Sequence, residues 1–336
     1  MNKTKIVATM GPSSSPREVL KEMFIAGLNV CRVNFSHGSY DQHAEVIRTV
    51  RELNEELGAN VAVLADLQGP KIRTGEMENN GVMLEVGASC QIITENILGT
   101  AERFSINYTN LPKDVSQGER ILLDDGKLEV VVEEITPSND VCVKVLLGGT
   151  LFPKKGVNLP DTNISLPALT AKDLTDLDFI FQHPIDWIAL SFVRSPDCIN
   201  NLKDLIRKTK HNAKVIAKIE MPQAVKHLRE IIRESDGIMI ARGDLGVELP
   251  IEEVPLIQKD IIKKCIHRAK PVIVATQMME SMIERTKPNR SEVTDVANAV
   301  LEGADASMLS GETAMGSHPK LVIETMTKII LEVEAK

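Results

Sequence analysis

Short, continuous runs of apolar residues recur along the chain, and each run is followed by a stretch in which apolar residues have helical spacing. Continuous runs are typical of parallel strands that are buried on both faces. The runs span residues 3–11, 30–36, 61–68, 186–192, 214–220, 237–242, 271–276 and 306–310. Eight strand–helix repeats without the glycine fingerprint of a dinucleotide-binding fold predict an α/β protein with a (β/α)8 barrel, the TIM-barrel architecture.

Polar residues mark the starts of the helices between these runs. Thr170 followed by Asp173 has the spacing of a capping box, and Ser195 before Pro196 places a capping residue ahead of a proline in the first turn. Helices are therefore predicted to begin directly after Thr170 and Ser195.

One interval interrupts the repeats. Between about residues 70 and 160 the helices disappear and β-rich segments with turn signals replace them, with a hairpin predicted at Asp125-Gly126. We therefore predict a discontinuous catalytic barrel, residues 1–69 and 161–336, and a small β-rich lid domain, residues 70–160, inserted after the third strand. Basic residues at both junctions favour a role in closing over a ligand, and these are Lys71, Arg73, Lys154 and Lys155.

The composition is that of an ordinary globular protein, with 43% hydrophobic and 26% charged residues. Acidic side chains outnumber basic ones by 47 to 39, which gives a net charge of −8, and aromatic residues make up only 3%. Such a chain is not expected to bind nucleic acid, which usually requires a basic face and rings that stack on bases. An anionic ligand would have to be held by a local cluster of cations.

The five cysteines form no C-x-x-C pair, which favours reduced thiols in the cytoplasm over a disulfide framework or a zinc site. The apolar run near the N-terminus is too short for a signal peptide, and no segment approaches the roughly 20 apolar residues of a membrane span. A cytoplasmic protein without a membrane partner is expected.

Polar and charged side chains that can bind ions or charged ligands stand at the end of almost every predicted strand, where the active sites of (β/α)8 barrels form. They are Arg32, Asn34, Ser36, His37, Asp66, Lys71, Arg73, Ser191, Lys218, Glu220, Arg242, Asp244, Thr276, Gln277, Ser310 and Glu312. A barrel with a purely structural role would not need such a set.

Lys218 and Glu220 stand two residues apart on a predicted strand, so both side chains point to the same face. They form either a structural ion pair or a metal-binding carboxylate beside a lysine that meets developing negative charge. Gly243 and Asp244 can present backbone N–H groups to an anion, and the Asp244 carboxylate can bind a hard divalent cation. Two carboxylates and few histidines suit Mg²⁺ or Mn²⁺ better than zinc.

Three side chains that favour contact with a phosphate or a cation follow Arg32: Asn34, Ser36 and His37. The hydroxyls of Thr276 and Ser310 either take part in chemistry or cap the helices that follow. The charge run in KDIIKKCIHRAK, residues 259–270, is typical of a solvated helix face. A divalent cation, several cationic side chains and a closing lid suit phosphoryl transfer, in which the protein mainly positions groups and neutralises charge.

Eight longer motifs occur in one order between residue 4 and about residue 316: TKIVATMGPSS, RVNFSHG, GPKIRTG, KKGVNLP, AKIE, DGIMIARGDLGVELP, ATQMMESM and ANAVLEGADASMLSGET. In these motifs and in their order the chain resembles the pyruvate kinase family. The resemblance implies transfer of a phosphoryl group from phosphoenolpyruvate to ADP, which gives pyruvate and ATP in the final step of glycolysis, with Mg²⁺ or Mn²⁺ as the cofactor.

The resemblance also implies roles for individual residues. The metal ligands would be Glu220 and Asp244. The substrate would be bound by Arg32, Lys218, Gly243, Asp244 and Thr276. The nucleotide would be bound by Asn34, Ser36, His37, Arg73 and Lys155. Lys218 would stabilise the migrating phosphoryl group, and the remaining enolate would be protonated by a water molecule linked to Thr276 or Ser310.

One position departs from the family pattern. Members that require K⁺ typically read D-T-K-G-P-E, and their cation is held by Asn, Ser and Asp side chains and a backbone carbonyl. Here the stretch is Asp66-Leu67-Gln68-Gly69-Pro70-Lys71, so that the residues of the cation site or its substitute are Asn34, Ser36, Asp66, Leu67 and Lys71. The Lys71 ammonium is a compact positive charge that can stand where the cation would bind, so K⁺ is not expected to be required.

Pyruvate kinases usually have a further C-terminal domain that helps to bind effectors and to build the tetramer, and no segment of this sequence corresponds to it. A truncated or an unusual short form is therefore expected, with a homo-oligomer as the full-length form. Two other functions stay open from the residues alone: a Mg²⁺-dependent lyase or aldolase acting on enolates of 2-oxo acids, and a catalytically inactive metabolite-binding scaffold.

Overall fold

The computed structural model describes residues 2–336, which divide into two compact units. One unit comprises residues 2–69, 168–245 and 252–336. The other comprises residues 70–167 and 246–251. The first unit contains the strand–helix repeats, and the second contains the β-rich interval.

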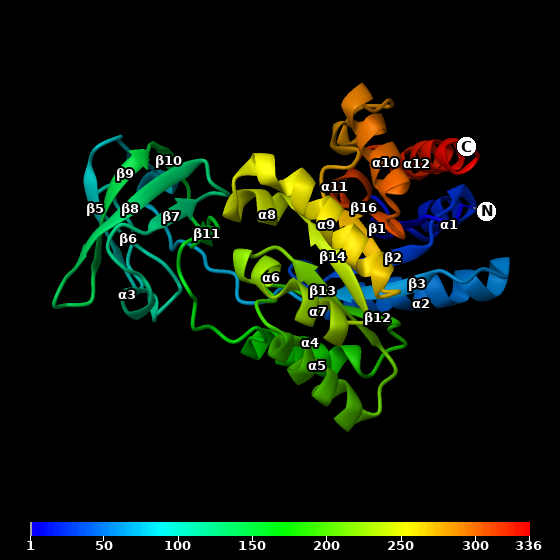
Figure 1. Cartoon of the computed structure of the whole chain (residues 1–336), viewed down its shortest axis with the longest axis horizontal. Coiled ribbons are helices and arrows are strands. Elements are labelled where there is room, and N and C mark those ends of the chain that lie inside the picture. Colours follow the sequence, from blue (N-terminus) through cyan, green and yellow to red (C-terminus); the bar gives the residue numbers. More distant parts are fainter. Residues whose placement is uncertain (1) are drawn as a thin grey trace. The chain divides into compact units, whose positions relative to one another are not determined.

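The first unit is a closed barrel of parallel strands with helices on the outside, so the predicted fold class is confirmed (Figure 1). Around the barrel the order is β1-β16-β15-β14-β13-β12-β3-β2. The strands are β1 (Lys5–Thr9), β2 (Val30–Asn34), β3 (Ala62–Asp66), β12 (Trp187–Leu190), β13 (Lys214–Ile219), β14 (Gly237–Ala241), β15 (Val272–Ala275) and β16 (Ala306–Leu309). All eight lie in the apolar runs from which strands were predicted.

The helices that accompany the barrel follow its strands in turn. They are α1 (Arg17–Ala26), α2 (Tyr40–Leu57), α4 (Ala171–Ile180), α5 (Pro196–Thr209), α6 (Pro222–Lys226), α7 (Leu228–Glu234), α8 (Arg242–Glu248), α9 (Val254–His267), α10 (Arg290–Glu302), α11 (Gly311–Ala314) and α12 (Pro319–Glu334), with the 3-10 turns η2 (Ile251–Glu253) and η3 (Glu280–Ile283). Two of these elements, α8 and η2, extend into residues 246–251 of the second unit. Within residues 2–336, no helix is both long and apolar enough to cross a bilayer.

The two predicted helix starts are confirmed, but only one has its predicted cap. Thr170 and Asp173 form a reciprocal capping box at the start of α4. Helix α5 begins at Pro196, as predicted, but the Ser195 side chain makes no capping hydrogen bond and instead lies 3.8 Å from Sγ of Cys198. Proline at the first helical position has no N–H to be satisfied, so this helix can start without that hydrogen bond.

Apolar side chains fill the interior of the barrel. The cluster contains Val7, Leu64, Ala189, Ile216, Met239, Ile273, Ala275, Ala306 and Met308. Because this interior is packed, polar groups that act on a ligand have to stand at the ends of the strands.

The second unit is built on two small sheets. A six-stranded sheet has the order β11-β7-β8-β9-β5-β6, and a two-stranded sheet pairs β10 with β4. The strands are β4 (Val82–Leu84), β5 (Ser89–Ile93), β6 (Arg103–Ser105), β7 (Arg120–Leu123), β8 (Leu128–Ile135), β9 (Val141–Leu147), β10 (Gly149–Leu151) and β11 (Val157–Asn158). This unit has an apolar core of its own, with Phe104, Tyr108 and Leu123 among its buried members.

The predicted hairpin at Asp125-Gly126 is confirmed, because Leu123 pairs with Leu128 across it and both turn residues have a positive φ. The prediction of no helix in this interval was wrong in detail. A short helix, α3 (Leu111–Asp114), with a proline in its first turn, and a 3-10 turn, η1 (Glu78–Asn80), lie between the strands. They are too short to produce a helical repeat of apolar residues in the sequence.

Candidate functional site

The carboxyl ends of strands β2, β3 and β13 bring together two cations and two carboxylates. The guanidinium Nε of Arg32 lies 2.7 Å from Oδ2 of Asp66. The Lys218 ammonium lies 3.4 Å from Oδ1 of Asp66 and 3.5 Å from Oε2 of Glu220. Lys218 also donates to the Ser191 hydroxyl at 2.6 Å. The predicted proximity of Lys218 and Glu220 on one face of a strand is therefore present.

Burial and charge act in opposite directions on these groups. Burial alone raises the pKa of the Asp66 carboxyl, but the Lys218 and Arg32 cations outweigh it and hold that pKa below its usual value. Burial alone would lower the pKa of the Lys218 ammonium, but the carboxylates of Asp66, Glu220 and Asp244 together raise it. Both groups are therefore charged at neutral pH.

For the Glu220 carboxyl, the nearby cation does not outweigh the effect of burial on the pKa. Glu220 is 2% exposed, and Oε1 accepts a hydrogen bond of 2.6 Å from the backbone N–H of Phe192. Burial raises the pKa of Glu220 to about 7, and the neighbouring Asp244 carboxylate adds to the rise against the opposing effect of Lys218. A buried carboxyl group beside a second carboxylate favours a bound cation, because a divalent ion would stabilise the charged form.

The donor set fits Mg²⁺ or Mn²⁺ only with help from other ligands. Among residues 2–336, no group of three or more His, Cys, Asp or Glu side chains could hold a metal ion by itself. Glu220 and Asp244 supply two carboxylates, and Mg²⁺ commonly completes its shell with water and with the phosphates of its substrate. The residues present therefore suit a metal that is shared with a phosphorylated ligand.

Hydrogen bonds join helix α8, which follows β14, to the segment that follows β15. The backbone N–H of Gly243, in α8, donates to Oγ1 of Thr276 at 2.8 Å. The Arg242 guanidinium donates to the Thr276 carbonyl at 2.6 Å and pairs with Asp295 of α10 at 2.8 Å. Thr276 has a left-handed φ of 68°. A β-branched residue is strained in this region, and such strain is often found where a side chain is held for function.

Ser310 stands at the start of α11, but its side chain makes no capping hydrogen bond. The capping alternative for this serine is therefore not supported. Its backbone N–H donates instead to the buried carboxylate of Glu312 at 2.7 Å, and Glu312 also accepts from the backbone N–H of Met279 at 3.1 Å. Glu312 thus connects the segments that follow β15 and β16.

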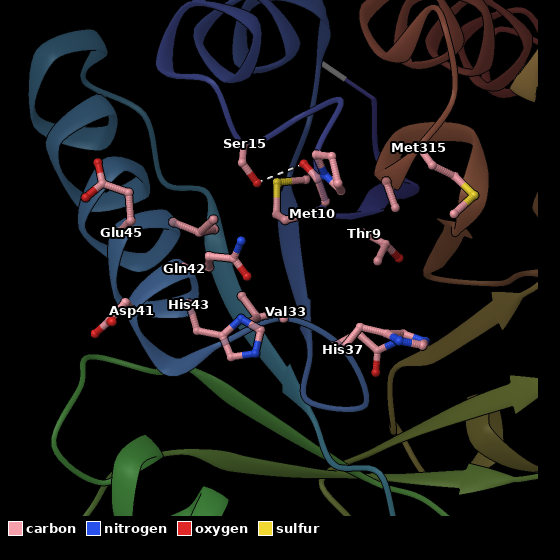
Figure 2. A pocket seen from close by; sticks show the side chains of 16 residues that line it. Thr9, Met10, Ser15, Val33, His37, Asp41, Gln42, His43, Glu45 and Met315 are labelled. Carbon is pink, nitrogen blue, oxygen red and sulfur yellow. Dashed lines mark hydrogen bonds between the residues drawn. The ribbon is translucent and has the colours of Figure 1, made fainter. Parts of the chain in front are cut away.

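A cavity of about 740 Å³ lies beside the end of β2, at the start of α2. Its lining residues are Thr9, Met10, Gly11, Pro12, Ser15, Val33, Asn34, His37, Gly38, Asp41, Gln42, His43, Glu45, Val46, Ala314 and Met315. Figure 2 shows Met10, Gln42 and Met315 around this space, from three different parts of the chain. The volume and the mixture of apolar and polar lining suit a small organic molecule.

The predicted nucleotide residues are divided between the two units. Asn34 and His37 line the cavity, and the Asn34 side chain accepts a hydrogen bond of 3.1 Å from the backbone N–H of Ser36. Arg73 and Lys155 belong to the second unit. There Arg73 donates to the carbonyl of Lys154 at 3.1 Å, and Lys155 lies 3.0 Å from Oδ1 of Asp124.

The predicted monovalent-cation residues are also divided. Both carboxylate oxygens of Asp66 lie near cations of the barrel, and the Leu67 carbonyl accepts a hydrogen bond of 2.7 Å from the Ser191 hydroxyl. Lys71 belongs to the second unit.

Several residues that shape the site were not identified from the sequence. Thr9 accepts a hydrogen bond of 2.9 Å from Arg32, Phe192 positions Glu220, and Asp295 pairs with Arg242. Thr9 is the last residue of β1, so the rule of inspecting strand ends could have found it. No local pattern marks Asp295, which lies on a helix far along the chain.

Comparison with known proteins gives a consistent result. The sequence model of the pyruvate kinase barrel domain matches residues 1–323. The chain is 45% identical to a pyruvate kinase of Staphylococcus saprophyticus over 100% of this chain and 58% of that protein. It is 47% identical to a pyruvate kinase of Corynebacterium efficiens over 98% of this chain and 69% of that protein.

A crystal structure of a pyruvate kinase from Cryptosporidium parvum superposes with a TM-score of 0.96 at 39% sequence identity, covering 99% of this chain and 70% of that one. The chain spans less than two thirds of the length of several relatives that it matches, among them the Staphylococcus saprophyticus protein at 58%.

Proposed function

The chain belongs to the pyruvate kinase family, and from this premise we propose that it carries the catalytic site for transfer of a phosphoryl group from phosphoenolpyruvate to ADP. The observation that carries the proposal is the buried ammonium of Lys218, which lies between Asp66 and Glu220 and is also influenced by the charge of Asp244. A cation held in this way can meet the negative charge of a phosphoryl group in transfer.

The metal would be held by Glu220 and Asp244, where it would neutralise charge on the phosphoryl oxygens. The protein's own residues then have separate tasks. Arg32 is fixed by Asp66 and Thr9 and would bind the substrate phosphate, for which a guanidinium is well suited. Thr276, held in a left-handed conformation beside Gly243, would receive the substrate carboxylate. A water molecule linked to Thr276 or Ser310 would protonate the enolate.

The cavity beside β2 would bind the nucleotide. Its volume of about 740 Å³ is within the range of small-ligand sites, and its apolar residues offer a surface for the flat face of a base. Asn34, Ser36 and His37 would face the phosphates, and Arg73 and Lys155 would contribute from the inserted unit. The β-rich domain, residues 70–160, would act as a lid that excludes water when the nucleotide is bound.

The finer assignments for ions and assembly belong to the same proposal. The active metal would be Mg²⁺ or Mn²⁺, and Lys71 would remove the need for K⁺ because its ammonium supplies the positive charge. The protein would act in the cytoplasm on phosphoenolpyruvate and ADP, and its full-length form would be a homo-oligomer.

The test is a coupled assay of pyruvate formation by this chain with phosphoenolpyruvate, ADP and Mg²⁺. The proposal expects pyruvate to form only when ADP and the divalent cation are both present. Pyruvate release without ADP would favour a lyase or phosphatase. Binding of phosphoenolpyruvate and Mg²⁺ without any turnover would favour a binding scaffold.

A further inference from the structure

A second cluster of cations lies away from the barrel mouth, in a hollow between helices α7 and α9. The hollow has a volume of about 330 Å³. Its lining residues are Arg229, Ile232, Asp260, Lys263, Lys264, His267 and Arg268. It therefore combines two arginines and two lysines with one histidine and one carboxylate, over a buried apolar residue, Ile232.

The single carboxylate of this cluster is already engaged. Asp260 pairs with Lys264, one helical turn along α9. Among residues 2–336, no carboxylate lies within the ion-pair distance of 4.0 Å from the charged groups of Arg229, Lys263 or Arg268. Three exposed cations thus line one hollow without an ion-pair partner of their own, in a chain whose net charge is −8.

A solvated helix face does not account for this arrangement. The charge run of residues 259–270 covers the second half of α9 and the residues directly after it, but Arg229 comes from α7, and residues from both helices line one open hollow. The helix dipole favours Lys264 and His267 in the last turn of α9. It gives no benefit to Arg229, which lies in the first turn of α7.

We propose that the hollow between α7 and α9 is a binding site for a small phosphate-bearing anion, separate from the site at the mouth of the barrel. A phosphate ester carries close to two negative charges, so it would relieve the repulsion among Arg229, Lys263 and Arg268. Guanidinium groups bind phosphate oxygens with paired hydrogen bonds, and Arg229 and Arg268 supply two of them here. The volume suits a ligand at the small end of the usual range.

The experiment follows the Ile232 methyl group, because that side chain reports on this hollow and not on the barrel mouth. The full chain is labelled with ¹³C at isoleucine δ1-methyl groups, the Ile232 signal is assigned by its loss in Ile232→Leu, and pyrophosphate is added without divalent metal. We expect a saturable shift with a dissociation constant of about 1 mM or tighter, as two or three partly exposed charge-assisted hydrogen bonds would give.

Two double variants test whether the cations of the hollow are responsible. Lys263→Gln with Arg268→Gln is expected to weaken the binding seen at Ile232 by about tenfold or more. Lys208→Gln with Lys328→Gln changes the net charge equally at exposed positions outside the hollow and is expected to leave the dissociation constant unchanged.

Several outcomes would overturn the proposal. The first is an Ile232 signal that does not shift when pyrophosphate is added. The second is a shift of the same size with KCl at equal ionic strength. The third is an equal loss of pyrophosphate affinity in both double variants. A response to heparin without a response to pyrophosphate would assign the hollow to a long polyanion instead. None of these results depends on whether the chain forms pyruvate, so the proposal stands or fails separately from the proposed function.

Discussion

Lys218 is the residue on which most of the site's charges converge. Its ammonium has oxygen partners at 2.6 Å in Ser191, 3.4 Å in Asp66 and 3.5 Å in Glu220. These contacts hold a buried cation in one position before any ligand arrives. Electrostatic stabilisation of this kind is effective because the groups do not have to reorganise during the reaction.

Replacing Lys218 should therefore reduce turnover much more than it reduces substrate binding. For Lys218→Met we expect a loss of roughly 10²–10³ in kcat, because one donor aimed at the transition state is removed. Steady-state pyruvate formation measures it, with circular dichroism as the check on folding. The control is Lys214→Met at the exposed start of the same strand, which should keep normal turnover. Near-normal kcat in Lys218→Met would exclude the proposed role.

Lys71 gives a second prediction at this scale. If its ammonium replaces a monovalent cation, the unmodified chain should be equally active in tetramethylammonium buffer with and without KCl. Lys71→Glu should lose activity without K⁺ and regain it when K⁺ is added. The exposed Lys144→Glu in strand β9 controls for the change in charge. Strong K⁺ activation of the unmodified chain would contradict the assignment.

At the scale of single elements, buried polar groups in the strands and helices are usually paired in hydrogen bonds. Strand β16 contains an exception, because the hydroxyl of Ser307 is fully buried and, within the described part of the chain, has no hydrogen-bond partner. A buried polar group without a partner costs about 1–3 kcal/mol relative to a satisfied one.

Ser307→Ala should for this reason raise the free energy of unfolding, by roughly 0.5–1 kcal/mol, because it removes the unsatisfied hydroxyl and leaves only a small space. Urea denaturation measures the change. Ser235→Ala is the matched control, since Ser235 is equally buried but donates to the Ile231 carbonyl at 2.7 Å, and its loss should destabilise the chain. Destabilisation by both substitutions to the same extent would count against the argument.

Helix α12 is joined to the start of β1 by Glu334. Its carboxylate accepts hydrogen bonds of 2.8 Å and 2.6 Å from the backbone N–H groups of Lys3 and Thr4. Partial burial raises the pKa of this carboxyl, but these hydrogen bonds outweigh burial and lower the pKa below its ordinary value of 4.5. A group with a lowered folded-state pKa stabilises the fold above its unfolded-state pKa and loses that contribution as the pH falls through its folded-state pKa.

The stability advantage of the unmodified chain over Glu334→Gln should accordingly be largest near neutral pH and shrink as the pH falls below 4.5. Melting temperatures measured across this range provide the comparison. Glu332→Gln, one exposed position in the same helix, should show a smaller difference. A difference for Glu334→Gln that does not change with pH would argue that the interaction is not one of charge.

At the scale of the whole molecule, the chain passes between two units with separate cores at four places: Gly69–Pro70, Pro167–Ala168, Leu245–Gly246 and Ile251–Glu252. Gly69 has a left-handed φ of 69°, and its backbone N–H donates to the buried carboxylate of Asp173 at 3.0 Å. A Cβ atom at this position would lie 2.8 Å from the Phe192 ring. The first junction is thus held to the barrel by a hydrogen bond and a close contact.

Gly69→Ala is expected to destabilise the chain by roughly 2 kcal/mol or more, from the left-handed backbone together with the clash. Gly58→Ala isolates the backbone contribution, because Gly58 has a φ of 59° and a Cβ there would meet nothing within 4 Å. Its cost should be about 1 kcal/mol. Equal costs in denaturant unfolding would show that the contact with Phe192 is unimportant.

The sequence by itself determined the class of fold and the positions of most charged groups in the site. Parallel strands buried on both faces have to be continuously apolar, so the runs of β1 to β3 and β12 to β16 could be identified locally. The polar side chains that end these runs then had to meet at one end of the barrel. The capping box of Thr170 and the turn at Asp125-Gly126 are local for the same reason.

The tertiary structure alone decided which groups touch and how strongly they influence one another. Asp295 reaches Arg242 from a helix 53 positions along the chain, and Arg229 meets Lys263 from a different helix. The high pKa of Glu220 follows from burial and from a neighbouring carboxylate, and no periodic pattern in the sequence reveals either of them. Distances between such groups depend on how packed elements cross, whereas the pattern along a chain records only which face of its own element each residue occupies.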